Sequence, residues 1–160
     1  DVQAPARTLF LPYLGGERTP HNDARVRGQF LNLGHETDKT ALTRSVLEGV
    51  TYAFKDSFDA LSATGTRMER LIGVGGGTKS AYWVKAIATA LNKPIELPVA
   101  GDFGGAFGAA RLGMMAAGAS IDIATVPQIQ SVVEPDANLA SAFDDGHARY
   151  KAAYEALRGL

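Results

Sequence analysis

The sequence contains no cysteine at all. This absence excludes disulfide bonds, thiolate zinc sites and cysteine nucleophiles, and with them a secreted domain held together by disulfides. No apolar stretch approaches the roughly 20 residues that a transmembrane helix needs. The first residues, Asp1–Pro5, have neither the basic nor the apolar part of a signal peptide, and an initiator methionine is missing. We therefore expect a cytoplasmic protein, without membrane contact, whose chain is processed or truncated.

The sequence also has no excess of charge of either sign, since 16 lysines and arginines nearly balance 17 aspartates and glutamates. No global field therefore draws the protein to nucleic acid, and we expect none as a partner. The histidines His21, His35 and His147 lie far apart and have no neighbour at metal-ligand spacing, so we predict surface histidines and no metal site. There is no Gly-x-Ser-x-Gly motif either, which leaves hydrolase chemistry without support.

The 160 residues, of which 46% are hydrophobic, are enough to bury a real core. Short apolar runs predict strands near residues 9–14, 28–33, 71–74 and 95–98, and helices are predicted from Asp38 to about Leu61 and over 80–91, 103–117 and 140–158. This alternation favours an α/β layer with a largely parallel sheet. The last helix is expected to pack on the outside, and the pattern weakens between residues 120 and 138.

The long helix that Asp38 can cap carries apolar residues at three- and four-residue spacing along its whole length. They form one continuous stripe made of Leu42, Val46, Val50, Phe54, Phe58 and Leu61.

A strand at Leu71–Val74 leads into the glycine turn Gly75–Gly77 and then into the helix that starts near Ser80. Such a turn brings unobstructed backbone amides to a helix N-terminus, which suits a nucleotide. The P-loop pattern fails at Thr78, and so does the third glycine of the dinucleotide fingerprint, for which Glu96 would be the ribose-binding acid. A turn that merely allows close helix packing is a further alternative.

Two further positions near glycines could serve either packing or a ligand. Trp83 could border an adenine ring, although core packing is the simpler interpretation. In the cluster Gly101–Gly108, Asp102 is expected first as a helix cap and only second as a ligand contact.

Five blocks together resemble one family, in order along residues 9 to 118. They are Phe10–His21, the strand Gly28–Leu33, Arg44–Val50, the glycine turn with Ser80 and Trp83, and Phe107–Leu112. The chain resembles the C-terminal domain of the FGGY carbohydrate kinases, most of all the xylulokinases. The stretch Gly16–His21 is the most specific part, and Asn32–Leu33 and Ala41 depart from the family pattern.

The resemblance implies an α/β fold of the actin-like ATPase (ribonuclease H-like) type, present in part, with a mostly parallel sheet flanked by helices. Residues 1–160 would be the nucleotide-side C-terminal domain, truncated at its N-terminal side, with 119–160 as a terminal extension. In the family, the turn that matches Gly75, Gly76 and Gly77 lies against adenosine, and a side chain at Ser80 or Ala81 could approach the purine.

The resemblance also implies the chemistry, which is ATP- and Mg²⁺-dependent phosphorylation of a ketopentose, with D-xylulose as the expected sugar. The family's catalytic aspartate and phosphate loop precede the matched region, so we assign no catalytic residue here. We expect the N-terminal half of the same kinase as a partner and leave a homodimer open. A dinucleotide-binding module of a dehydrogenase and a non-catalytic interaction domain stay as alternatives.

Overall fold

The structure is a computed structural model that describes residues 1–99, 104–125 and 127–159. Its elements follow one another as β1 (Leu9–Leu11), β2 (Gln29–Leu31), α1 (Lys39–Ala63), the 3-10 helix η1 (Gly76–Lys79), α2 (Ala81–Leu91), β3 (Ile95–Pro98), α3 (Gly104–Ala116), the 3-10 helix η3 (Ile121–Ile123), β4 (Ile129–Val133) and α4 (Ala140–Leu157). The predicted helices are confirmed, the predicted strand 95–98 is present over its whole length, and the predicted strands 9–14 and 28–33 are present in shorter form.

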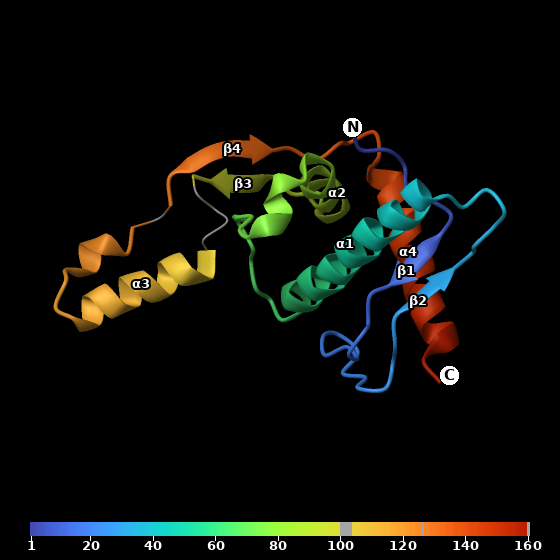
Figure 1. Cartoon of the computed structure of the whole chain (residues 1–160), viewed down its shortest axis with the longest axis horizontal. Helices are drawn as coiled ribbons and strands as arrows, with labels where there is room; N and C mark the ends of the chain where they lie inside the picture. The colour runs from blue at the N-terminus through green and yellow to red at the C-terminus, as the bar shows by residue number, and fades with distance from the viewer. Residues whose placement is uncertain (100–103, 126, 160) are drawn as a thin grey trace.

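The main body consists of the β1–β2 hairpin and the helices α1, α2 and α4 (Figure 1). Its core joins residues from the first, middle and last parts of the chain, including Leu11, Tyr52, Ala86, Phe143 and Tyr150, all of which are almost fully buried. Burial of a leucine or phenylalanine side chain such as Leu11 or Phe143 stabilises by about 1.5–3 kcal/mol. The body is therefore held together by contacts between segments distant in sequence.

The expectation of a mostly parallel sheet is wrong. β1 pairs with β2 and β3 pairs with β4, in both cases antiparallel, as two separate two-stranded sheets. The segment 71–74 forms only a single parallel bridge, from Ile72 to Glu96 of β3. The segment stays short because Gly75 has a φ of 94°, which ends the extended conformation directly after Val74. The strand that pairs with β3 over its length is instead the antiparallel β4.

The last helix was predicted to pack on the outside. α4 has one exposed face, and from its other face it contributes Phe143, Tyr150 and Tyr154 to the main core. Gly146 allows this approach, since a Cβ at that position would collide with the hydroxyl oxygen of Tyr52 on α1. The strand β4 was not expected at all. Its five residues are only partly covered, which is why the sequence there shows no clear apolar pattern.

The apolar stripe of α1 is not the face that the helix buries. The buried residues of α1 are instead Ser45, Glu48, Gly49, Thr51, Tyr52 and Asp56. Gly49 lies against β1, where a Cβ would collide with the carbonyl oxygen of Phe10, so β1 packs closely on this other face. Along the stripe, Phe54 and Leu61 keep 48% and 49% of their surface exposed.

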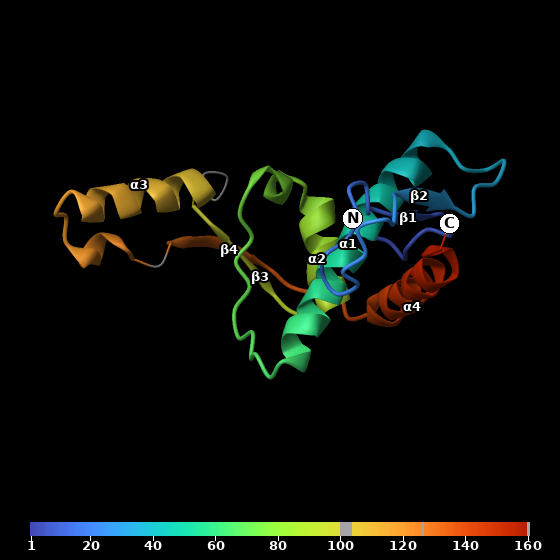
Figure 2. The same ribbon diagram turned by 90° about the horizontal axis from the view of Figure 1, so that it is seen from below.

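The helix α3 projects away from the main body, together with η3, in both views (Figures 1 and 2). None of its residues is buried, and Phe107, Leu112 and Met114 are at least half exposed. The expected cap Asp102, with Gly101 and Phe103, lies outside the described residues. Among the described helices, none is both long and apolar enough to cross a bilayer.

Candidate functional site

An open apolar groove of about 590 Å³ runs between α1, the glycine turn and α2. We call it the α1–α2 groove. One wall is the exposed half of the α1 stripe, from Phe54 to Leu61, and the other is α2 from Trp83 to Leu91. Residues 71–78, with Gly75–Gly77 among them, close it along the side. No charged side chain lines the groove within the part of the chain that the structure describes.

The glycine turn is anchored to β3 by two backbone hydrogen bonds. The amide of Gly73 donates to the Glu96 carbonyl over 2.9 Å, and the amide of Glu96 donates to the Leu71 carbonyl over 2.8 Å. The turn itself then leaves the extended conformation, because the positive φ of Gly75 is one that residues with a side chain rarely adopt. The result is a fixed turn whose glycines face the groove.

The three glycines of the turn have different surroundings. A Cβ at Gly76 would meet no atom within 4 Å, whereas a Cβ at Gly77 would lie 2.6 Å from the Trp83 ring. Gly76 is exposed and has no positive φ. Gly76 therefore has open space in front of it, while Gly77 serves the packing of Trp83.

The start of α2 separates the predicted site residues into two groups. Ser80 caps α2, its hydroxyl oxygen accepting the amide hydrogen of Trp83 over 3.3 Å. Ala81 lines a second hollow of about 580 Å³ on the other side of α2, together with Tyr82 and Lys85. The turn also continues through η1 rather than directly into α2. The structure thus places Gly75, Gly76 and Gly77 in the α1–α2 groove, and Ser80 and Ala81 beside it.

Trp83 belongs both to the wall of the groove and to the helix packing. Its ring lines the groove, and its indole N–H donates to the Leu47 carbonyl over 3.1 Å and to the Thr51 hydroxyl over 3.2 Å. Both expectations for this residue, packing and a position beside a ligand, are compatible with this place. The two hydrogen bonds fix the distance between α1 and α2 at this end of the groove.

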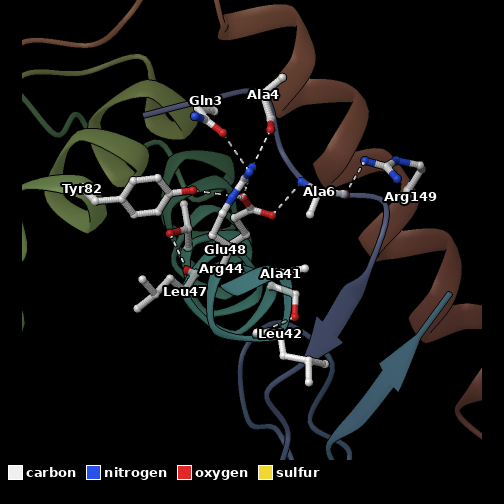
Figure 3. A network of polar contacts seen from close by, with 12 residues as sticks. Gln3, Ala4, Ala6, Ala41, Leu42, Arg44, Leu47, Glu48, Tyr82 and Arg149 are labelled. Carbon is white, nitrogen blue, oxygen red and sulfur yellow. Dashed lines mark hydrogen bonds and ion pairs between the residues drawn. The ribbon is translucent and has the colours of Figure 1, made fainter. Parts of the chain in front are cut away.

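A buried glutamate ties the same helices to the beginning of the chain (Figure 3). Glu48 of α1 is 2% exposed, and its carboxylate accepts hydrogen bonds from Arg44, from the Tyr82 hydroxyl over 3.1 Å and from the Ala6 amide over 3.0 Å. Arg44 in turn donates to the Ala4 carbonyl over 2.6 Å. Sequence reasoning missed this network, since no local pattern shows that position 48 is buried.

The network shifts the pKa of Arg44 and of Tyr82. Burial would lower the pKa of Arg44, but the hydrogen bond and the charge of Glu48 outweigh it and raise that pKa. Burial, together with the negative charge of Glu48, raises the pKa of the Tyr82 hydroxyl. Glu48 is thus a buried carboxylate that is paired and hydrogen-bonded, which is how buried charges are tolerated.

Glu96 does not face a ligand as the dinucleotide alternative would require. Its carboxylate is paired with the guanidinium of Arg70, whose Nε donates to Oε1 over 3.1 Å. The hydrogen bond from Arg70 lowers the pKa of Glu96. Because the backbone of Glu96 also holds the bridge to residues 71–73, this ion pair supports the base of the glycine turn.

The prediction of surface histidines is wrong for His147 and His21. His147 is 6% exposed, and its Nε2 lies 2.6 Å from Oδ1 of the buried Asp56. His21 is half-buried and stacks on Tyr154 with ring centroids 3.6 Å apart. Both positions depend on partners far along the chain. Among the described residues, no three His, Asp or Glu side chains are grouped so that they could hold a metal ion.

Comparison with known proteins shows which family the chain belongs to. The model of the FGGY family of carbohydrate kinases, C-terminal domain, matches residues 1–117. The chain belongs to the FGGY family of carbohydrate kinases. The resemblance to the FGGY family seen in the sequence is confirmed. Membership of this family favours the carbohydrate-kinase hypothesis over the dehydrogenase module and the interaction domain.

Relatives within the FGGY family extend the match over nearly the whole chain. The xylulose kinase of Escherichia coli K12 is 38% identical over 155 residues, which make up 94% of this chain and 32% of that kinase. The xylulose kinase of Klebsiella pneumoniae is 42% identical over 107 residues, 67% of this chain and 22% of that kinase. This chain therefore spans about a third or less of the length of these relatives.

Solved structures of FGGY kinases show the same fold. A Brucella ovis structure described as a xyloylose kinase has a TM-score of 0.89 and 54% sequence identity, and the match covers all of this chain and 34% of that one. The xylulose kinase of Rhodospirillum rubrum has a TM-score of 0.79 at 27% identity, over 99% of this chain and 32% of that one. The small antiparallel sheets thus belong to an α/β fragment that matches the C-terminal part of such kinases.

Proposed function

We propose that this chain is the adenosine-binding C-terminal part of an ATP-dependent kinase that converts D-xylulose to D-xylulose 5-phosphate. The observation that carries the proposal is the open α1–α2 groove beside Gly75–Gly77. The chain's membership of the FGGY family and its likeness to xylulose kinases support the proposal of a sugar kinase that acts on D-xylulose.

The groove fits the base and ribose of a nucleotide in size and character. Its volume of about 590 Å³ lies within the roughly 300–1,000 Å³ of ordinary ligand sites. Its walls include the exposed apolar stripe of α1, which is costly to leave in water unless something covers it. A flat, weakly polar purine ring between Phe58 and Ile87 would cover this surface while the charged phosphates stay outside.

The glycine turn would bring the main chain close to the ligand. Gly75 supplies the backbone turn, and Gly76 offers open space where a side chain would otherwise stand. We propose that Ser80 acts at the same end by capping α2 and holding Trp83 in place, whereas Ala81 lines the hollow on the other side of α2 and is given no contact with the purine.

The chemistry itself is assigned to the part of the kinase that precedes this chain. Mg²⁺ would neutralise charge on the transferring phosphoryl group, and phosphoryl transfer depends mostly on positioning and charge stabilisation. In the family, the catalytic aspartate and the phosphate loop precede the matched region, so we propose that they, and not this chain, supply the base and the main contacts to Mg²⁺. The contribution of this chain is to bind and orient the nucleotide.

The remainder of such a kinase would also cover the exposed side of α3. Phe107, Leu112 and Met114 project from a helix without a single buried residue. An apolar surface of this kind marks a contact with another part of a protein. We propose that the N-terminal two thirds found in the relatives lie against it.

A coupled assay of the full-length kinase that contains this chain tests the proposal. ADP release should depend on both ATP and D-xylulose, and mass spectrometry should show a sugar phosphate as product. The isolated 160-residue chain serves as the control and should release no ADP with D-xylulose. Turnover by the isolated chain would place a catalytic base within it, and absence of D-xylulose-dependent turnover in the full-length kinase would refute the substrate.

A further inference from the structure

The α1–α2 groove has few side chains that could read the edge of a base. Within the described residues, its polar side chains are those of Ser57, Thr78 and Trp83. The rest of its lining is apolar or glycine. The capacity of a site to choose between purines depends on such groups, because adenine and guanine differ in the donors and acceptors along one edge and share the same flat shape.

Each of these three side chains already donates its hydrogen inside the protein. The Ser57 hydroxyl donates to the Ala53 carbonyl over 3.0 Å, and the Thr78 hydroxyl donates to the Gly75 carbonyl over 2.8 Å. The Trp83 indole N–H is shared between α1 acceptors. Within the described part of the groove, no side-chain donor is therefore free for the ring nitrogen N1 of adenine.

The hydrogen-bonding capacity that remains in the groove does not distinguish one purine from another. The Ser57 and Thr78 oxygens can still accept a hydrogen bond, but each of the three purines carries a donor for it, namely the 6-amino group of adenine and the N1–H of guanine and of hypoxanthine. Main-chain amides of the glycine turn could reach N3 or N7, which are acceptors in every purine. The shape and apolar walls of the groove recognise a purine ring without regard to its substituents.

We infer that the kinase selects purine nucleoside triphosphates as a class and discriminates only weakly between ATP, GTP and ITP. The inference rests on the proposed function, since it concerns the nucleotide of the same groove. An apolar site without a dedicated hydrogen bond separates close analogues by roughly 10- to 200-fold, whereas a site built to pair with a polar group reaches about 10⁴-fold.

The test measures kcat/KM of the full-length kinase for ATP, GTP and ITP at saturating sugar. We expect GTP and ITP to lie within about 200-fold of ATP, as an apolar site predicts. A larger preference for ATP would overturn the inference. The conservative variants Ser57→Ala and Thr78→Val should leave the ATP-to-GTP ratio within about twofold of the original, because neither side chain reads the base. A larger change in that ratio would also overturn it.

A variant in the glycine turn separates this inference from the proposed function. Gly76→Asp should lower kcat/KM for ATP and GTP by the same factor if both nucleotides use the groove. If Gly76→Asp lowers kcat/KM for both nucleotides while the wild-type kinase strongly prefers ATP, the inference of weak selectivity is refuted and the proposed function stands. If it changes neither, the nucleotide binds elsewhere and both the proposed function and the inference fail.

Discussion

A negative charge at Gly76 should weaken ATP binding without disturbing the fold. A Cβ at this position meets no atom within 4 Å, and its φ is not positive, so a side chain fits without strain. The free energy of unfolding should therefore change by less than about 0.5 kcal/mol, as for other exposed positions. Any loss of ATP binding in Gly76→Asp then reports on the ligand rather than on folding.

The magnitude follows from the repulsion between the new carboxylate and the nucleotide phosphates. At a separation of roughly 8 Å and an effective dielectric constant of about 20, two unit charges repel by about 2 kcal/mol. This corresponds to a KM for ATP that is roughly 30-fold higher, and added salt should reduce the effect by screening. The KM for the sugar should not change.

The matched control is Gly76→Asn, which has the same shape and no charge. Coupled ADP-release assays at varied ATP should give this variant a KM for ATP within about threefold of wild type, since it lacks the repulsion. Thermal unfolding followed by circular dichroism checks that both variants fold. If the Asp variant binds ATP as well as the Asn variant and wild type do, the glycine turn does not face the nucleotide.

Three further predictions concern the scaffold of the groove. Gly49→Ala should lower the free energy of unfolding by about 1–3 kcal/mol in urea titrations, because the added methyl group collides with the Phe10 carbonyl. Glu48→Ala should cost about 3–5 kcal/mol in the same assay, since it leaves Arg44 and the Tyr82 hydroxyl without their buried partner, and Glu48→Gln should cost less. Because Arg70 lowers the pKa of Glu96, the stability from this pair is present above the ordinary pKa of 4.5 and is lost as the pH falls through the lower folded value. Arg70→Met should remove that part of the acid dependence of the unfolding temperature, and an unchanged dependence would show that the pair contributes nothing.

Local signals predicted the elements that position the groove. Asp38 caps α1 as expected, and α2 starts next to Ser80 where its beginning was predicted, because caps and helix starts depend on residues within one helical turn. Asn92 ends α2 with a left-handed conformation for the same local reason. The glycine turn was likewise visible from its glycines alone.

Features that depend on distant partners could not be read from the sequence. His147 is buried with its Nε2 2.6 Å from Oδ1 of Asp56, which lies 91 positions away in the sequence. The stripe of α1 has the pattern of a buried face, but Gly49 brings β1 to the other side and leaves part of the stripe open. The prediction of a parallel sheet was wrong for a similar reason, since tertiary contacts determine which strands pair.

The most direct test of the central claim is a crystal structure of the full-length kinase that contains this chain, bound to ADP. The account predicts the purine ring within the α1–α2 groove, between the Phe54–Leu61 wall and the Trp83–Leu91 wall, with the main chain of Gly75–Gly77 beside the adenosine. Density for the nucleotide at another place, with this groove filled by protein side chains from the rest of the kinase, would contradict it.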